Sequence, residues 1–325
     1  MGIEIAGIGS YLPERILTNA DLEKIVDTND EWITTRTGIK ERRIAKDGEA
    51  TSDLAIRAAE RALKKAKLKT SDIDAVIVAT ITPDMFFPST ACFVQKGLGM
   101  NSAAVFDISA ACSGFIYGLG IARDFLRCGT YKNILLIGAE TLSRITDWKD
   151  RGTCVLLGDG AGAVILRNSN SDSDILSVYL GADGNSSGLL FMPGGGSRNP
   201  ATAKTVEDRL HYLKMEGNKL FKVAVRAMAD SALKAIDMAG ISPNDVTLVI
   251  PHQANIRIVE GVAKLMNITL DRVYINIQKY GNTSAATTPI ALEEAIYEGK
   301  IKKGDIAVLV AFGGGLTWGA AVIKI

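Results

Sequence analysis

Short, uninterrupted runs of aliphatic and β-branched residues recur along the chain and are separated by longer stretches with helical composition. The runs lie at 75–80, 134–137, 162–166, 246–250 and 306–310. Strands that are apolar along their whole length belong in sheets covered on both faces. The stretches 52–67 and 219–239 are rich in Ala, Leu and Lys and are predicted helices. This alternation predicts an α/β architecture.

The order of these segments is repeated within the chain. A helix and strand from Ala55 to Asp74 resemble a second pair from Ala224 to Asp245, and each copy is followed by two more strands, at 134–139 and 163–166 and at 306–311 and 321–324. Extra chain is inserted in the first copy at about 141–157, and the polar stretch 168–174 is the natural join. We therefore expect two halves, 1–172 and 173–325, related by a pseudo-twofold axis. The alternative is that two amphipathic helix–strand units are alike in composition only.

Composition excludes several classes of protein. The chain has 325 residues, 47% of them apolar and 22% charged, which is typical of a globular protein. Its net charge of +1 gives no reason to expect a nucleic-acid partner. No apolar run approaches 18 residues and no signal peptide is visible, so we expect no membrane association and a cytoplasmic location.

The reactive side chains are few. Four Cys without a C-x-x-C pair and only two His give no zinc ribbon, no redox motif and no His-rich metal site. A P-loop is absent, and the G-x-G sequences at Gly7 and Gly160 do not continue as a dinucleotide fingerprint. We expect neither a metal nor a cofactor.

Cys112 has the setting of a nucleophile. It follows an apolar strand that runs to about Ile108, has small neighbours on both sides, and precedes a helix predicted to extend to Arg127 with Gly129 just beyond it. A tight strand-to-helix turn presents a nucleophile, and a helix N-terminus lowers the pKa of a Cys thiol. The backbone N–H of Cys112 could also hold an oxyanion. A buried structural Cys is the alternative, and it suits Cys92, Cys128 and Cys154.

Two further polar residues follow predicted strands in turns of small residues. His252 ends the strand before Gln253, and Asn282 follows a strand predicted over 273–277. A neutral His and an Asn amide can both donate hydrogen bonds to one developing oxyanion. The glycine-rich turn at 313–315 could supply N–H groups for a second oxyanion. The other histidine, His211, is interpreted as non-catalytic.

The chain is identified by its motifs as a member of the β-ketoacyl-acyl-carrier-protein synthase III family, condensing enzymes of the thiolase superfamily. The resemblance covers the whole chain and rests on Gly7-Ile-Gly-Ser-Tyr-Leu-Pro13, Asp30-Glu-Trp-Ile33, Arg36-Thr-Gly38, Ala110-Ala-Cys-Ser-Gly114, Gly158-Asp-Gly-Ala-Gly162, Pro251-His-Gln-Ala-Asn255, Gly281-Asn-Thr-Ser284 and Phe312-Gly-Gly-Gly-Leu-Thr-Trp-Gly319. Ser113 stands where many members have Ala.

The resemblance implies a thiolase-like, duplicated five-layer αβαβα fold, a homodimer and a two-step transferase reaction in fatty acid biosynthesis. Cys112 would take an acyl group from acyl-coenzyme A. Malonyl-acyl-carrier-protein would then lose carbon dioxide, with His252 and Asn282 stabilising the enolate. The N–H groups of Cys112 and Gly314 would form the oxyanion hole.

The resemblance also assigns the binding residues, which fall into three groups. Coenzyme A would contact Trp32, Arg36, Arg151, Asn218, Phe221 and Asn255, with Arg151 inside the insertion noted above. The acidic carrier protein would dock on Lys222, Arg257 and Lys264. Phe87 resembles the residue that the partner subunit contributes to the acyl pocket.

Three other interpretations remain open from the sequence alone. A papain-like thiol hydrolase also uses Cys, His and Asn in this order. A relative within the superfamily, such as a 3-hydroxy-3-methylglutaryl-coenzyme-A synthase or a secondary-metabolite chain starter, would share the fold. A non-catalytic acyl-coenzyme-A-binding scaffold would keep Trp32 and Arg151 but give Cys112 no special reactivity.

Overall fold

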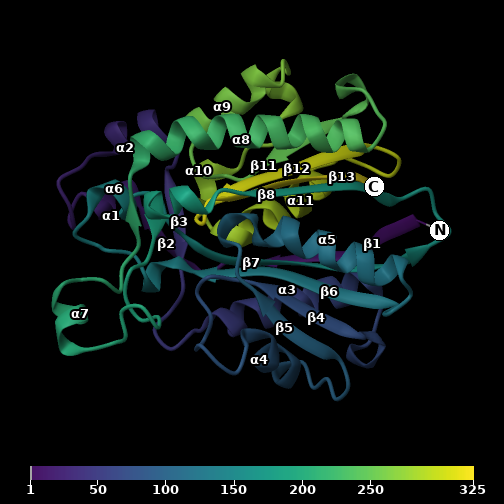
Figure 1. Ribbon diagram of the computed structural model, residues 1–325, viewed down its shortest axis with the longest axis horizontal. Helices are drawn as coiled ribbons and strands as arrows, with labels where there is room; N and C mark the ends of the chain where they lie inside the picture. The colour runs from purple at the N-terminus through teal and green to yellow at the C-terminus, as the bar shows by residue number, and fades with distance from the viewer. Residues whose placement is uncertain (1) are drawn as a thin grey trace.

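Two β-sheets with helices between and outside them build the protein in the computed structural model, which describes residues 2–325 (Figure 1). The first sheet has five strands in the order β1 (Gly2–Tyr11), β7 (Asp159–Ser169), β6 (Asn133–Thr141), β4 (Ala75–Ala79) and β5 (Ala104–Ile108). The second has four in the order β11 (Leu248–Pro251), β12 (Ile306–Gly313), β13 (Thr317–Lys324) and β8 (Asp174–Ala182).

The long helices form three layers around these sheets (Figure 1). The layer outside the first sheet has α3 (Thr51–Ala66) and α4 (Thr90–Gly97), the layer between the sheets has α5 (Gly114–Arg127) and α11 (Thr287–Tyr297), and the layer outside the second sheet has α8 (Gly217–Met238) and α9 (Ile256–Leu265). The result is the expected five-layer αβαβα fold. No helix among residues 2–325 is both long and apolar enough to cross a membrane.

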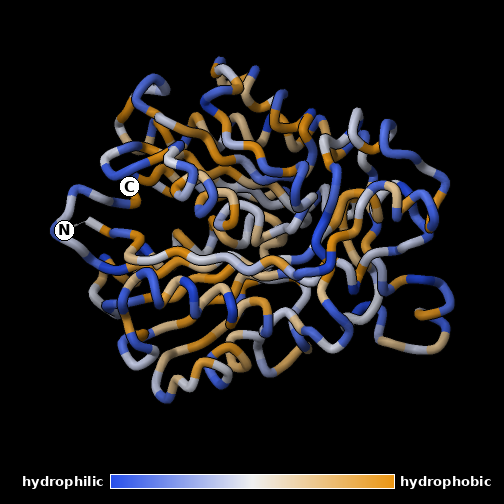
Figure 2. The backbone as a smooth tube through the Cα atoms, turned by 180° about the vertical axis from the view of Figure 1, so that it is seen from behind, coloured by the Kyte–Doolittle hydropathy of each residue, from blue (hydrophilic) through white to orange (hydrophobic). Residues whose placement is uncertain are grey.

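The apolar strands are covered on both faces, as their sequences predict. Along β4, Ala75 and Ile77 pack into the central core with α5 and α11, whereas Val76 and Val78 pack beneath α3. Successive side chains of a strand point to opposite faces, so each face needs its own apolar set. In Figure 2 the hydrophobic colour accordingly concentrates along the inner strands, and the hydrophilic colour along the outer loops.

The two sheets repeat one topology. In the first, β4 is parallel to β6, β6 is antiparallel to β7, and β7 is antiparallel to β1. In the second, β11, β12, β13 and β8 repeat that pattern strand for strand. The helices repeat as well, since α3 precedes β4 and α8 precedes β11. The duplication is therefore one of topology, and not of composition alone.

The polar segment at 170–173 leads from β7 in the first sheet to β8 in the second. We propose on this ground that the halves are residues 1–172 and 173–325, because all strands of the first sheet precede the segment and all strands of the second follow it.

Smaller elements complete the chain and border the site. The short strands are β2 (Arg15–Thr18), β3 (Glu41–Ile44), β9 (Leu190–Phe191) and β10 (Lys214–Met215). The short helices are α1 (Asn19–Leu22), α2 (Asp30–Thr37), α6 (Arg151–Cys154), α7 (Ala203–Glu207) and α10 (Ile277–Tyr280). Short 3₁₀ helices occur at Thr70–Asp72, Ala111–Ser113, Leu142–Arg144, Gly184–Leu189, Pro243–Asp245, Leu270–Arg272 and Ser284–Ala286.

One predicted strand is wrong. The segment 273–277 forms only an isolated parallel bridge between Val249 and Val273, and Ile277 already begins α10. The buried side chain of Gln253 takes the place of a continuing ladder. Its Nε2 donates to the carbonyl of Tyr274 at 3.1 Å, and its Oε1 accepts from the N–H of Asn276 at 3.2 Å.

Candidate active site

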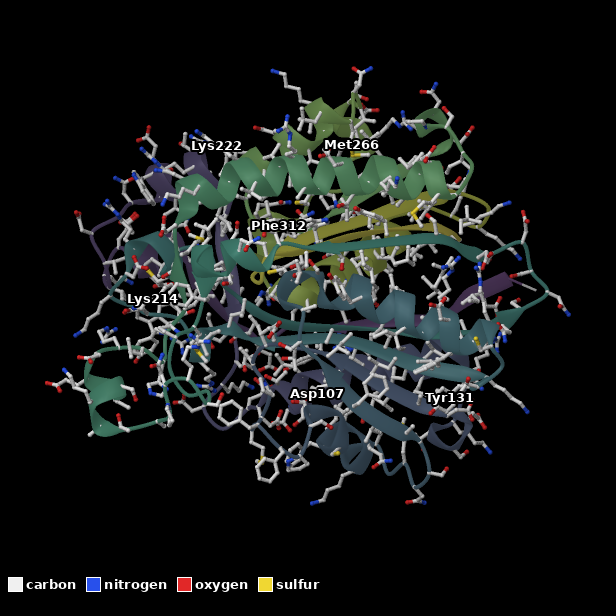
Figure 3. The ribbon with its side chains drawn as sticks, in the orientation of Figure 1. Asp107, Tyr131, Lys214, Lys222, Met266 and Phe312 are labelled. Carbon is white, nitrogen blue, oxygen red and sulfur yellow. The ribbon has the colours of Figure 1, made fainter. Side chains whose placement is uncertain are left out.

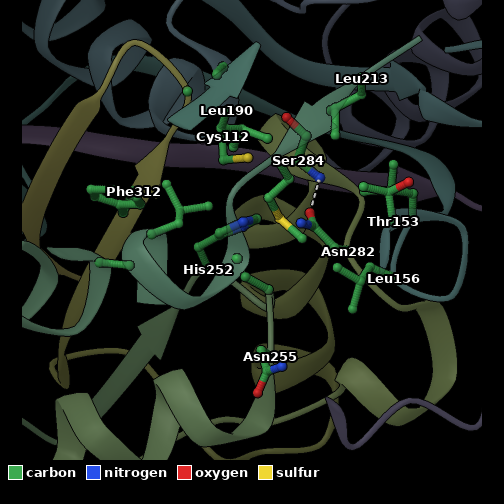
Figure 4. Close-up of a pocket in the computed structure, with 18 of the residues that line it drawn as sticks. Cys112, Thr153, Leu156, Leu190, Leu213, His252, Asn255, Asn282, Ser284 and Phe312 are labelled. Atoms are coloured by element: carbon green, nitrogen blue, oxygen red, sulfur yellow. Dashed lines mark hydrogen bonds between the residues drawn. The ribbon is translucent and has the colours of Figure 1, made fainter. Parts of the chain in front are cut away.

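A cavity of about 1030 Å³ opens where the two halves meet. Cys112, His252 and Asn282 all line it, and their side chains face the same space (Figure 4). Each comes from a different turn, as the sequence predicts. Most of the remaining lining is apolar and includes Leu142, Leu156, Leu190, Leu213 and Phe312.

The turn that carries Cys112 is tightly packed. β5 ends at Ile108, the 3₁₀ turn Ala111–Ser113 follows, and α5 begins at Gly114. Ala111 has a φ of 47°, in the left-handed region that non-glycine residues rarely adopt. A Cβ added at Gly313 would lie 2.6 Å from the backbone nitrogen of Cys112, so the turn rests directly on this glycine. Only small residues fit here, as expected for a nucleophile turn. Gly129, beyond the end of α5, has a φ of 71° and fits the predicted end of that helix.

The sequence analysis predicts a lowered pKa for the Cys112 thiol, and the structure indicates a raised one. The residue is only 7% exposed, and burial raises the pKa of the thiol to about 12, with the nearby Glu140 carboxylate acting in the same direction. Desolvation destabilises the thiolate by more free energy than the helix N-terminus contributes to stabilising it. Cys112 is therefore a thiol at physiological pH, and its reaction requires an acceptor for the proton.

His252 follows β11 and is fully enclosed. Its backbone N–H donates to the carbonyl of Val310 at 2.7 Å, which fixes it beside β12. Burial lowers the pKa of the imidazole to about 3, so the ring is neutral at physiological pH. Its Nδ1 is buried without a hydrogen-bond partner among the described residues. A neutral imidazole carries one N–H donor, which suits stabilisation of an anion more than proton removal.

Asn282 is held on both sides. Its backbone N–H donates to the carbonyl of Leu156 at 2.8 Å, and its own carbonyl accepts from Gly158 at 2.9 Å. Its side-chain Oδ1 accepts the N–H of Ser284 at 2.8 Å (Figure 4). Because the oxygen is engaged, the amide NH₂ is the end free to donate. Asn282 thus supplies a second donor to the cavity that His252 lines.

Gly314 lies in the turn between β12 and β13 and also lines the cavity. Neither its N–H nor that of Cys112 donates to another backbone group within residues 2–325. Free N–H groups at a cavity wall are what an oxyanion hole needs.

The outer part of the cavity has a cationic and aromatic border. The guanidinium carbon of Arg36 lies 4.7 Å from the centre of the Trp32 ring, and that of Arg151 lies 4.8 Å from it. Trp32, Arg36, Asn218, Phe221 and Asn255 line the cavity, whereas Arg151 reaches it only by stacking on Trp32.

The three predicted docking cations are spread over α8 and α9. Lys222 projects from the first turns of α8 (Figure 3), and Arg257 lies in the first turn of α9; both border the cavity. Lys264, two turns along α9 from Arg257, is exposed but does not line it. No ion pair involves any of the three in the described part of the chain.

Two further residues considered in the sequence analysis lie away from the cavity. Phe87 is 84% exposed and does not line the cavity of its own chain. His211 is also outside it, and its Nε2 lies 2.9 Å from the hydroxyl of Thr205. No group of three His, Cys, Asp or Glu side chains among the described residues is placed to hold a metal ion.

Two polar residues beside Cys112 are missing from the predicted site. Ser284 lines the cavity two residues after Asn282, and Glu140 is fully buried at the end of β6. The available signal for Glu140 was its place directly after the apolar run 134–139. Charged residues are almost never fully buried unless they are paired.

A duplicated thiolase-like fold with a cysteine, a histidine and an asparagine around one cavity defines a condensing enzyme of the thiolase superfamily. Comparison with known proteins narrows this class. Models of 3-oxoacyl-[acyl-carrier-protein] synthase III match residues 106–184, and its C-terminal model matches 236–325. The chain belongs to the β-ketoacyl-acyl-carrier-protein synthase III family, the condensing enzymes that initiate fatty acid synthesis.

Similarity extends over the whole chain. It is 60% identical to the β-ketoacyl-[acyl-carrier-protein] synthase III of Caldanaerobacter subterraneus, covering 98% of this chain and 97% of the relative, and 55% identical to that of Clostridioides difficile with the same coverage. The crystal structure of the Aquifex aeolicus 3-oxoacyl-[acyl-carrier-protein] synthase III superposes with a TM-score of 0.93 at 53% identity, covering 100% of both chains. A papain-like hydrolase is therefore excluded.

Proposed function

We infer that this chain transfers an acyl group from acyl-coenzyme A to Cys112 and condenses it with malonyl-acyl-carrier-protein, giving 3-oxoacyl-acyl-carrier-protein and carbon dioxide. The observation that carries the proposal is the meeting of Cys112, His252 and Asn282 in one largely apolar cavity. No step calls for a metal or redox cofactor, because decarboxylation itself generates the carbon nucleophile.

In the first step the sulfur of Cys112 attacks the thioester carbonyl of acyl-coenzyme A. The tetrahedral oxyanion is held by the N–H groups of Cys112 and Gly314, which have no backbone partner within residues 2–325. The carbon–sulfur bond to coenzyme A then breaks, the coenzyme A thiol leaves with a proton, and acyl-Cys112 remains.

In the second step the malonyl carboxylate leaves as carbon dioxide, and its bonding electrons form an enolate on the remaining thioester. His252 and the Asn282 amide donate hydrogen bonds to the enolate oxygen. A neutral imidazole is the right form for this, and the enclosure of His252 keeps it neutral. The carbanion attacks acyl-Cys112, and the cysteine sulfur leaves. One proton is taken up overall.

Coenzyme A would lie along the outer part of the cavity. The Trp32 ring, with Arg36 and Arg151 stacked on it, offers an aromatic face for adenine and cations for phosphates. Asn218, Phe221 and Asn255, which line the passage inward, would contact the pantetheine arm.

The carrier protein would dock on Lys222, Arg257 and Lys264. These cations are exposed and unpaired in the described residues, and two of them border the cavity mouth. Such a local patch attracts an acidic partner even though the net charge of the chain is +1.

A second copy of the chain would cover the loop that carries Phe87. Met85, Phe86 and Phe87 are 48%, 79% and 84% exposed, an unusual concentration of apolar surface. In a homodimer Phe87 would enter the partner's acyl pocket. Sedimentation should then show a dimer, and Phe87→Asp should weaken it. All four cysteines are free, which accords with a reducing, cytoplasmic location.

Acylation of the isolated protein tests the central proposal. Incubation with acetyl-coenzyme A or a longer acyl-coenzyme A should add one acyl mass, which peptide mapping places on Cys112, and Cys112→Ala should abolish the adduct. An acyl-coenzyme-A binder without catalysis would retain the ligand and show no adduct. Failure to acylate with every short, branched or medium acyl chain would contradict the proposal.

A further inference from the structure

Glu140 is a buried acid without a basic partner. Its carboxylate accepts hydrogen bonds from the hydroxyl of Thr82 at 2.6 Å, from the hydroxyl of Thr80 at 3.2 Å and from the N–H of Ile81 at 3.2 Å. No Lys, Arg or His side chain pairs with it in the described part of the protein. Burial raises the pKa of this carboxyl to about 7. Such a group beside a reactive centre is a candidate for proton transfer.

Ser284 lies between this acid and the nucleophile. Its hydroxyl is buried and has no hydrogen-bond partner among the described residues, and Ser284 lines the cavity together with Cys112. The turn Ser284–Ala286 packs directly on β6, the strand that carries Glu140, because a Cβ added at Gly138 would lie 2.3 Å from the carbonyl of Ala285. The backbone of Ser284 has a φ of 48°, and its N–H is held by Asn282. The turn therefore fixes an unsatisfied hydroxyl beside Cys112, and Figure 4 shows Ser284 beside the cysteine.

Other acids near Glu140 have partners of their own. On β7, Asp159 accepts hydrogen bonds from Ala45 and Ser143. Asp84, after β4, accepts from Ser52, and Asp107, on β5, accepts from the N–H groups of Thr90 and Ala91. The titratable side chains that line the cavity are Cys112 and His252 and, towards its outer border, Arg36, Lys222 and Arg257. Of the two possible acceptors for the Cys112 proton, Glu140 is the stronger base, because burial lowers the pKa of His252 to about 3.

We propose that Glu140, acting through the Ser284 hydroxyl, holds the Cys112 proton for the lifetime of the acyl-enzyme. This inference rests on the acylation of Cys112 proposed above and adds two residues to it. As the Cys112 sulfur bonds to the acyl carbon, its proton passes to the Ser284 oxygen, and the Ser284 proton passes to Glu140. The coenzyme A sulfur leaves and takes a proton from solvent. When condensation releases the cysteine sulfur, Glu140 returns its proton by the same route.

This arrangement also removes a negative charge before the enolate forms. A protonated Glu140 is neutral, so the enolate held by His252 and Asn282 develops without a neighbouring carboxylate. Like charges in a dry cavity repel strongly. Glu140 is thus a positioning residue for protons, whereas Cys112 is the residue that reacts.

The test is the pH dependence of acylation in a single turnover, followed by quenched intact-mass measurement with acetyl-coenzyme A. The wild-type rate should rise with pH through an inflection near 7 as Glu140 ionises. Glu140→Gln and Ser284→Ala should each lose that inflection and acylate about 10²-fold more slowly at pH 8. Asp159→Asn, which removes a neighbouring buried acid that is not linked to Ser284, should keep the inflection even where it lowers stability.

A second readout separates proton transfer from general damage to the site. Decarboxylation of malonyl-acyl-carrier-protein by Cys112→Ala involves no cysteine proton. Adding Glu140→Gln to that variant should leave decarboxylation as fast or faster. The inference is overturned by a neutral inflection that persists in Glu140→Gln, by a wild-type acylation rate in Ser284→Ala, or by an equal loss of decarboxylation. If the wild-type chain forms no adduct at all, the proposed function fails first.

Discussion

Replacing Gly313 by alanine should disturb the nucleophile turn in a predictable way. The added Cβ would lie 2.6 Å from the backbone nitrogen of Cys112 and 3.1 Å from the Cβ atoms of Ala111 and Cys112. The first contact is 0.4 to 0.8 Å shorter than the 3.0 to 3.4 Å of tight real contacts. Since the neighbour is backbone, the turn itself must move by about that amount.

A shift of this size has two measurable costs. Overpacking of this kind destabilises a fold by about 1–3 kcal/mol, which lowers Tm by about 2–6 °C in a chain of this length. A displacement approaching 1 Å at the reacting atom costs about 10- to 100-fold in rate. Stopped or quenched acylation with saturating acetyl-coenzyme A should show that loss in kcat. The KM for acyl-coenzyme A should stay within about twofold, because Trp32 and Arg151 lie on other elements.

Gly184→Ala is the matched control. Its Cβ would meet no atom within 4 Å, and its backbone is not in the left-handed region, so both rate and Tm should remain those of the wild type. Wild-type acylation and stability in Gly313→Ala would refute the packing argument. An equal loss in Gly184→Ala would show that the effect is not specific to the turn.

Three further predictions follow from other contacts. Gly138→Ala places a Cβ 2.3 Å from the carbonyl of Ala285, and so should displace the Asn282 turn and slow decarboxylation more than acylation, as separate assays of the two half-reactions would show. Trp32→Ala should raise the KM for acyl-coenzyme A about tenfold and leave the saturated acylation rate unchanged, since only the stacking surface is lost. Asp147→Asn should lower the free energy of unfolding by about 2 kcal/mol at pH 7, because the hydrogen bond from Arg209 lowers the pKa of that carboxyl to about 2. A depressed carboxyl pKa stabilises the fold above the unfolded value, so this variant should match the wild type once the pH of denaturant titrations falls from about 4 towards 2.

The layers of the fold could be predicted because the strand sequences carry the information locally. The strand β12 is apolar at every position from Ala307 to Ala311, and its alternate side chains pack into two different cores. A strand with this sequence must be covered on both faces to bury all of its apolar side chains. The strand predicted at 273–277 failed for a reason outside the segment. Beyond the bridge to Val249, the carbonyl of Tyr274 and the N–H of Asn276 bond to the side-chain amide of Gln253, whose reach cannot be read from periodicity.

For the site, too, the local sequence predicts some features, and others depend on residues that are distant along the chain. The meeting of Cys112, His252 and Asn282 in one cavity could be predicted because each lies in a turn whose small residues are visible in the sequence. The protonation state of Cys112 could not, since it depends on burial by segments far along the chain and on Glu140, 28 positions away in sequence but beside it in space. Trp32 and Arg151 were assigned by resemblance, and only the structure shows one ring stacked by two guanidinium groups.

The two turns at the centre of the molecule are counterparts in the duplicated halves. The turn Ala111–Ser113 begins α5 with Ala111 at a φ of 47°, and the turn Ser284–Ala286 begins α11 with Ser284 at a φ of 48°. Each turn rests on a strand glycine from the opposite half, Gly313 for the first and Gly138 for the second.

The corresponding positions of these two turns carry different side chains. In one half the position after the left-handed residue is Cys112, the proposed nucleophile, and in the other it is Ala285. Asn282 and Ser284, to which we assign enolate stabilisation and proton transfer, belong to the second turn. Neither half alone contains all of the proposed catalytic residues. If the chain is cut between β7 and β8, activity should return only when the two fragments associate so that each glycine again packs against the turn of the other fragment.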